Sequence, residues 1–296
     1  MMRRKRAEER EGIGRGARRA LLYLASPVGV LLVLFVGPMA VLLIVSFEYS
    51  SFTRTGGFTL SNYSTVLTDA SYLRVAWTTI FVATMSMGVM LLAAIPLAYF
   101  LVFRLGKLEL PILLLLVLSD ELNPLIRIYA WRMLLGREGL INSFLTSLGV
   151  IEHPIDALLF SKIAVIIVLS ASFIPYATIP IYASLKAIDP SLLEAADDLG
   201  SRWLAKFRKI LLPLAAPGIF VTVILVYIPL FSEFAAPALV GGTSGYMLGN
   251  AVQEQVLELG DWGVGSAMSF LLLVLSGVVA LIGYKLGRIR RLEAIT

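Results

Sequence analysis

The sequence predicts an all-α membrane protein in which six apolar segments form one helical bundle. The chain is 58% hydrophobic and 15% charged, with a mean hydropathy of +0.86, whereas a soluble domain is about 45–50% apolar. Its 296 residues accommodate about six spans of ~20 residues together with their connections. No room is left for a separate folded catalytic domain.

Each expected span is an apolar window long enough to cross the hydrocarbon core. Prolines and glycines recur within these windows, so the helices are expected to be bent. A basic segment, residues 1–20, precedes the transmembrane domain, residues 21–287, and a short tail, 288–296, follows it. The expected spans lie near residues 21–47, 75–103, 109–133, 162–185, 212–234 and 264–286.

The distribution of positive charge favours one orientation in the membrane. If the N-terminus is cytoplasmic, the connections on that side carry most of the 25 Lys and Arg, which is the bias expected of cytoplasmic loops. Both termini and the connection before the fifth span are therefore expected in the cytoplasm. The basic run at the N-terminus is expected to anchor the first span at the lipid surface and not to bind nucleic acid.

The connection over residues 189–213 predicts a compact amphipathic helix between two membrane spans. Asp189 can cap this helix and Pro190 suits its first position. Gly200 can supply the left-handed residue that ends it, and a second amphipathic piece is expected to lead to Pro213, which opens the fifth span. Taken alone, the pattern fits equally a helix lying on anionic lipid headgroups and a helix that docks into a soluble partner.

The same connection carries the spacing EAA-x3-G-x9-I-x-LP. This spacing resembles the signature loop of permease subunits in ATP-binding-cassette importers, so the chain is identified as a six-span, type I, MetI-like importer permease. The resemblance decides between the two alternatives, because in that family the loop contacts a separate ATPase subunit. The ATPase-coupling residues that it implies are Glu194, Ala195, Ala196, Gly200, Ile210, Leu212 and Pro213.

Further segments, from Leu125 onward, are similar to the permeases of spermidine/putrescine importers. Those permeases tend to have Pro-Phe-Trp-Thr where this chain has Ser119-Asp120-Glu121-Leu122, so the resemblance implies a polyamine or related cation without fixing which one. The matching residues are Leu125, Ile126, Arg127, Tyr129, Ala130, Trp131, Gly139, Asn142, Gly149, Val150 and Ile151, and later Glu233, Phe234, Pro237, Gly241, Gly242, Gly249, Asn250, Asp261 and Trp262.

The family resemblance implies a division of labour in a bacterial inner membrane. A cytoplasmic ATPase dimer would drive transport, a second permease subunit, related or identical, would complete the pathway, and an extracytoplasmic solute-binding protein would deliver the solute. The sequence is consistent with this arrangement because it has no ATPase phosphate loop: Gly106-Lys107 is followed by Leu108 and not by Ser or Thr. We therefore expect a transport subunit, not an enzyme, which binds no cofactor or metal while its partners use ATP.

Charged and polar residues in the third span mark a candidate substrate pathway, because such groups are costly in lipid. In one hypothesis the carboxylates attract a cationic substrate and the aromatic rings offer cation–π faces. In the other, Asp120 or Glu121 pairs with Arg127, bridged by Asn123 on the same helical face. The candidate pathway residues are Asp120, Glu121, Asn123, Arg127, Tyr129, Trp131 and, near the outer end of the fifth span, Glu233.

Two other classes of membrane protein compete with the importer. An ion-coupled secondary transporter, working without an ATPase, would use the buried carboxylates for coupling and usually contains internal repeats, none of which is evident in the sequence. A membrane enzyme needs a nucleophile with its base, or a set of metal ligands. The chain has no cysteine and one histidine, His153, so the enzyme ranks last.

Overall fold

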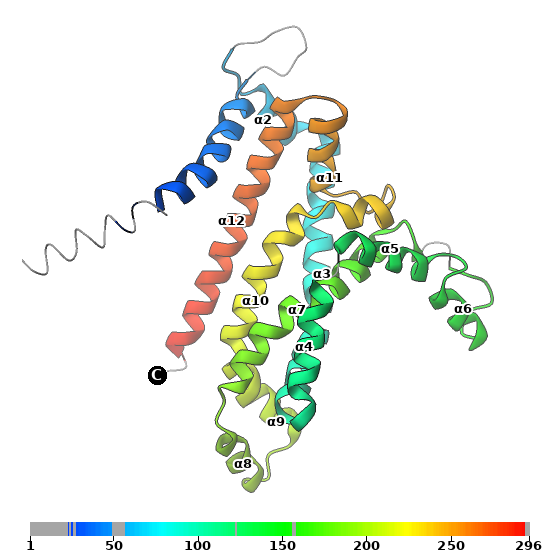
Figure 1. Ribbon diagram of the computed structural model, residues 1–296, viewed down its shortest axis with the longest axis vertical. Coiled ribbons are helices and arrows are strands. Elements are labelled where there is room, and N and C mark those ends of the chain that lie inside the picture. The colour runs from blue at the N-terminus through cyan, green and yellow to red at the C-terminus, as the bar shows by residue number, and fades with distance from the viewer. Residues whose placement is uncertain are drawn as a thin grey trace, which may run out of the picture.

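Figure 1 shows the computed structural model, an elongated helical bundle that confirms the predicted all-α fold class. The structure describes residues 23, 25, 28–48, 57–121, 123–155 and 158–293, except for the side chains of residues 120, 280 and 282–293. The predicted basic segment, residues 1–20, and the end of the predicted tail, residues 294–296, lie outside the described residues.

Long apolar helices form most of the bundle. Within the described residues, five helical stretches are long and apolar enough to cross a membrane: Val28–Ser46, α3 (Ala70–Phe103), α7 (Lys162–Lys186), the continuous helix Trp203–Ser232, and Trp262–Val279 of α12 (Trp262–Glu293). The continuous helix Trp203–Ser232 comprises α9 (Trp203–Lys206), a π-helical turn and α10 (Leu212–Ser232). The shorter helices are α2 (Ser61–Thr68), α4 (Glu109–Asp120), α5 (Pro124–Leu135), α6 (Leu140–Ser147), α8 (Pro190–Asp198) and α11 (Leu248–Gln253). Single turns of π-helix occupy Phe207–Leu211, Pro237–Gly241 and Glu254–Glu258.

The range expected as one continuous third span contains two helices. α4 ends at Asp120, and α5 begins at Pro124, because proline disfavours helical backbone at the residue before it. Asn123 caps α5, its side-chain oxygen accepting a hydrogen bond from the Leu125 N–H at 2.9 Å. α4 runs along the bundle, whereas α5 and α6 project sideways from it (Figure 1).

α7 is the central helix and packs against both α3 and α10. Gly218 of α10 lies so close to α7 that a Cβ atom there would be 2.4 Å from the carbonyl oxygen of Pro180. One turn later, the Thr222 hydroxyl donates to the carbonyl oxygen of Ala177 at 3.1 Å. Small residues let helix backbones approach closely in a membrane bundle. α7 and α10 are therefore a tightly fitted pair, and the connection that carries α8 joins them.

The helix at the fifth predicted span begins earlier than expected. We predicted that Pro213 opens the span, but the helix is continuous from Trp203 to Ser232. A π-helical turn precedes the proline, and in it the Leu212 N–H donates to the carbonyl of Phe207. Proline lacks an N–H and its ring displaces the carbonyl four residues earlier, so the wider turn accommodates Pro213 without ending the helix.

The two ends of the bundle differ. At one end lie α8, α9 and the connection between α3 and α4, while α2 lies at the other (Figure 1). The helix Val28–Ser46 stands apart from the rest and is held at its α2 end. There the Ser46 and Tyr63 hydroxyls share a hydrogen bond of 2.7 Å, and Phe47 stacks on Phe58 with ring centroids 4.7 Å apart.

Candidate functional site

The residues predicted to cap and to end α8, Asp189 and Gly200, both do so. Asp189 caps the helix, its carboxylate accepting a hydrogen bond from the Ser191 N–H at 2.9 Å. This backbone hydrogen bond holds the pKa of Asp189 below its ordinary value. After the helix, Gly200 has a left-handed backbone with φ of 67°, and the Ser201 N–H closes the turn on the carbonyl of Ala196 at 3.0 Å.

The signature residues of α8 face in opposite directions. Ala196 is 7% exposed, and Leu193 packs against the core. Glu194 is exposed, and within the described residues its carboxylate has no hydrogen bond or ion pair. Leu199, at the end of the helix, is 85% exposed. Glu194 and Leu199 are therefore both accessible at the α8 end of the bundle.

The second half of the loop is fixed to the bundle. Lys206 of α9 forms an ion pair with Asp197 of α8. Trp203 stacks on Phe207, with ring centroids 5.3 Å apart, and meets the ring of Tyr99 on α3 edge to face at 6.2 Å. α8 is thus joined to α3 through α9, and along the chain it lies between α7 and α10.

Ile210, Leu212 and Pro213 belong to the long helix and not to the exposed tip. Ile210 and Leu212 are half-buried, and Leu211 between them is 3% exposed. Four signature residues are exposed, Glu194, Ala195 and Gly200 at the α8 end and Pro213 on the long helix, so the motif combines exposed residues with residues that are buried in part.

The candidate pathway residues of the third segment cluster at the break between α4 and α5. Asp120 is the last residue of α4, and its side chain lies outside the described residues. Glu121 is exposed at the break, and Arg127 of α5 donates from Nη1 to the carbonyl oxygen of Ser172 on α7 at 3.1 Å. Because the helix is interrupted, Glu121 and Arg127 do not lie on one continuous helical face.

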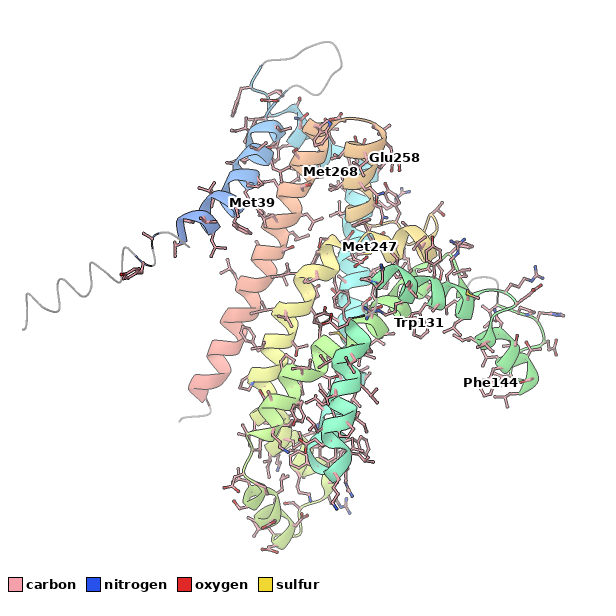
Figure 2. The ribbon with its side chains drawn as sticks, in the orientation of Figure 1. Met39, Trp131, Phe144, Met247, Glu258 and Met268 are labelled. Carbon is pink, nitrogen blue, oxygen red and sulfur yellow. The ribbon has the colours of Figure 1, made fainter. Side chains whose placement is uncertain are left out.

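The structure does not bring the two aromatic candidates together. Trp131 is half-buried against the core, and Tyr129, two residues earlier on the same helix, is 51% exposed. Residues two apart on a helix point in nearly opposite directions. Figure 2 shows Trp131 where α5 adjoins the bundle and Phe144 on the projecting α6.

Glu233 has a structural contact that the sequence did not predict. Its Oε1 accepts hydrogen bonds from the N–H groups of Ala235 at 3.0 Å and Ala236 at 3.3 Å. The carboxylate thereby caps the short helical segment that follows α10. Asn123, Arg127 and Glu233 all bind backbone groups, whereas Glu121 and Tyr129 are exposed.

Several residues that carry the polyamine-permease resemblance shape the backbone. The buried amide of Asn142 donates to the carbonyl of Gly136 at 3.0 Å and accepts from the N–H of Ile155 at 2.9 Å, which fastens the loop after α6. A Cβ at Gly139 would lie 2.4 Å from the carbonyl oxygen of Leu134. A larger residue at position 139 would therefore displace this loop.

The second group of matching residues holds the segment between α10 and α12. Asn250 donates to the carbonyl of Phe234 at 2.8 Å, and a Cβ at Gly249 would be 2.8 Å from the carbonyl oxygen of Glu233. Asp261 accepts from the Val264 N–H at 2.9 Å at the start of α12. These contacts make the segment a closely packed structural unit.

An apolar pocket of about 440 Å³ lies between the end of α10, α11 and α12. Its polar lining side chains are Ser232, Gln253 and Ser269. No candidate pathway residue lines this pocket, and none of its lining residues carries charge, so it does not have the chemistry of a cation site.

Sequence reasoning missed one cluster at the α8 end of the bundle. Lys186, in the last turn of α7, donates to both carboxylate oxygens of Glu109 at 2.6 and 2.8 Å. The Tyr182 hydroxyl donates to the same carboxylate at 2.5 Å. Glu109 begins α4, so these residues are 73 and 77 positions apart, and no local pattern in the sequence indicates their contact.

The model of the family described as "Binding-protein-dependent transport system inner membrane component" matches residues 55–289. The chain belongs to this family. It is a transport permease component of the inner membrane, and this membership favours the importer over the ion-coupled secondary transporter.

Curated relatives agree over most of the chain. It is 36% identical over 232 residues to the spermidine/putrescine transport system permease protein PotB of Escherichia coli, covering 78% of this chain and 84% of the relative. It is 33% identical over 258 residues to PotB of Haemophilus influenzae, covering 85% and 88%. Against PotC of Escherichia coli the identity is 28% over 256 residues, covering 85% and 88%.

Solved structures share the fold. A chain of a bacterial ABC transporter that imports the acidic polysaccharide alginate superposes with a TM-score of 0.75, at 18% identity, covering 93% of this chain and 98% of that one. A chain of the MetNI methionine ABC transporter in an inward-facing conformation superposes with a TM-score of 0.55, at 19% identity, covering 74% and 95%. The type I importer permease architecture predicted from the sequence is therefore confirmed.

Proposed function

We propose that this chain is a permease subunit of an ATP-binding-cassette importer for a polyamine or a related cation. The observation that carries the substrate class is the 36% identity to PotB across 84% of that protein, whose name specifies spermidine and putrescine. The loop around α8, with its exposed Glu194 and Leu199, supports the coupling to a separate ATPase.

In the proposed mechanism α8 docks in a groove of a cytoplasmic ATPase subunit. ATP-driven closure of the ATPase dimer moves α8, and the closely fitted pair of α7 and α10 moves with it. Such a displacement alternates the bundle between inward-open and outward-open states. The chain contributes no nucleotide chemistry in this account, because its ATPase partners bind and hydrolyse ATP.

The proposal places α8 and both termini in the cytoplasm. Arg104 and Lys107 lie in the connection between α3 and α4, Lys186 lies in the last turn of α7, and Lys206 lies in α9. These elements lie at the α8 end of the bundle (Figure 1), and positive residues accumulate on the cytoplasmic side of membrane proteins. A solute-binding protein would deliver substrate at the opposite end, near α2. A second permease subunit, related or identical, would complete the pathway.

The proposed pathway passes the break between α4 and α5. Glu121 is exposed there, and with Asp120 it would lower the barrier for a cation in the low-dielectric surroundings. Tyr129, also exposed, offers a cation–π face.

The direct test is reconstitution. The chain would be coexpressed with its partner permease and ATPase, purified as a complex, and placed in liposomes with the solute-binding protein and radiolabelled spermidine or putrescine. ATP-dependent uptake is expected. Uptake by this chain alone, driven by a proton or sodium gradient without ATP, would refute the proposal.

A further inference from the structure

The two halves of the interrupted third segment are each tied to α7, at well-separated points. At the α8 end, Lys186 and Tyr182 of α7 hold the carboxylate of Glu109, at the start of α4. Further along α7, the carbonyl of Ser172 accepts the hydrogen bond from Arg127 of α5. The first tie involves α4 alone and the second α5 alone.

Two prolines lie between these ties. Pro175 and Pro180 fall inside α7, and each removes a backbone hydrogen bond and bends the helix. A change in the bend of α7 would therefore move the Lys186 end relative to Ser172. Since each end of α7 holds a different helix, α4 would shift relative to α5.

The Glu109–Lys186 contact has more hydrogen bonds than a single-bonded ion pair. Both carboxylate oxygens accept from Lys186, the Tyr182 hydroxyl adds a third hydrogen bond, and the Glu109 side chain is 18% exposed. The Lys186 side chain is 51% exposed, so water and salt reach the pair, and its geometry is set by the three hydrogen bonds that converge on one carboxylate.

We infer that the Glu109–Lys186 ion pair makes α4 follow the α8 end of α7, so that movement of α8 shifts Glu121 at the far end of α4. Glu109 is in this account a positioning residue for transport, acting through α4. The inference rests on the proposed importer function and adds to it the route by which ATPase docking reaches the candidate cation pathway.

Charge reversal tests the contact in the complete, reconstituted transporter. Glu109→Lys and Lys186→Glu, made singly, should each lower ATP-dependent spermidine uptake about fivefold or more, the range of coupling expected for close charge pairs, while ATP hydrolysis continues. The double variant, with the pair reversed, should recover at least half of the uptake. Lys107→Glu is the matched control, since it makes the same charge change on an exposed side chain at the same end and should transport normally.

The inference is overturned if both single variants transport normally, or if the double variant assembles as well as the parent yet transports no better than the singles.

A second measurement does not depend on uptake. The chain has no cysteine, so spin labels can be attached to new cysteines at Leu114 of α4 and Met133 of α5, both exposed.

Trapping the ATPases in the ATP-bound state should change the distance between the labels in the parent, and this change should be lost in Lys186→Glu. An unaltered change in Lys186→Glu contradicts the role of the ion pair. A parent complex that neither transports nor responds to ATP contradicts the proposed function itself, so the two failures are distinguishable.

Discussion

Gly218→Ala is the substitution that most directly perturbs the fit between α7 and α10. The added Cβ would lie 2.4 Å from the carbonyl oxygen of Pro180 and 2.5 Å from the Ser184 hydroxyl oxygen. The hydroxyl can rotate away, but the carbonyl belongs to the helix backbone. To restore an ordinary contact the two helices must separate by roughly 1 Å, because close-packed interiors do not absorb such an overlap.

The size of the effect follows from overpacking. Extra atoms in a well-packed core cost roughly 1–3 kcal/mol. Separation also weakens the hydrogen bond from Thr222 to Ala177, and interhelical hydrogen bonds of this kind contribute about 0.6 kcal/mol in membrane bundles.

The matched control is Gly88→Ala in α3, where a Cβ would have no atom within 4 Å. Both changes replace a helical glycine with alanine, which by itself favours a helix by about 1 kcal/mol. The difference between them therefore isolates the packing cost. Thermal denaturation in detergent should place Gly218→Ala below Gly88→Ala by roughly 3–10 °C, and ATP-dependent uptake should fall in Gly218→Ala alone. Equal melting temperatures for the two variants would refute the reasoning.

Other predictions concern the coupling loop and the pathway. Glu194→Gln should leave the melting temperature unchanged and weaken copurification of the ATPase, since the exposed carboxylate has no partner within the described chain; loss of the folded permease would contradict this. Gly200→Ala, at φ of 67° with open space around it, should cost about 1–2 kcal/mol of backbone strain and loosen ATPase docking, with Gly200→Asn less affected. Because the hydrogen bond to Ser191 lowers the pKa of Asp189, the cap is complete above the unfolded pKa of about 3.9 and is lost as pH falls through the folded value; amide exchange in the first turn of α8 should rise there, and Asp189→Asn should abolish that pH dependence. Replacing Asp120 with Asn and Glu121 with Gln should abolish cation uptake while the complex still assembles, and unchanged uptake would remove these residues from the pathway.

The features that sequence predicted well are those with local causes. Asp189, Pro190 and Gly200 lie within one short connection, and their capping and left-handed conformations are consequences of their own chemistry. The spacing of the signature residues then identified the family, which the family match confirms.

Two kinds of feature were not predicted from the sequence: whether a helix is continuous through a proline, and which residues far apart in the chain contact each other. Apolar residues lie on both sides of Pro124, so the apolar window over 109–133 did not reveal that the helix stops and restarts there. Conversely, Pro213 predicted the start of a membrane span, but the helix is already formed before it and continues past it, with a π-helical turn just ahead of the proline. The contact between Glu109 and Lys186 joins positions 77 residues apart, and only the packing of α4 on α7 creates it.

The central claim is that the tip of α8 touches a separate ATPase. Because the chain has no cysteine, a single cysteine at Leu199, which is 85% exposed, can carry a photo-crosslinker, with Leu148 beyond α6, 59% exposed, as the control position. In the assembled, transporting complex, the account predicts a crosslink to the ATPase from position 199 and none from position 148. A complex that transports with ATP but gives no ATPase crosslink from position 199 would contradict it.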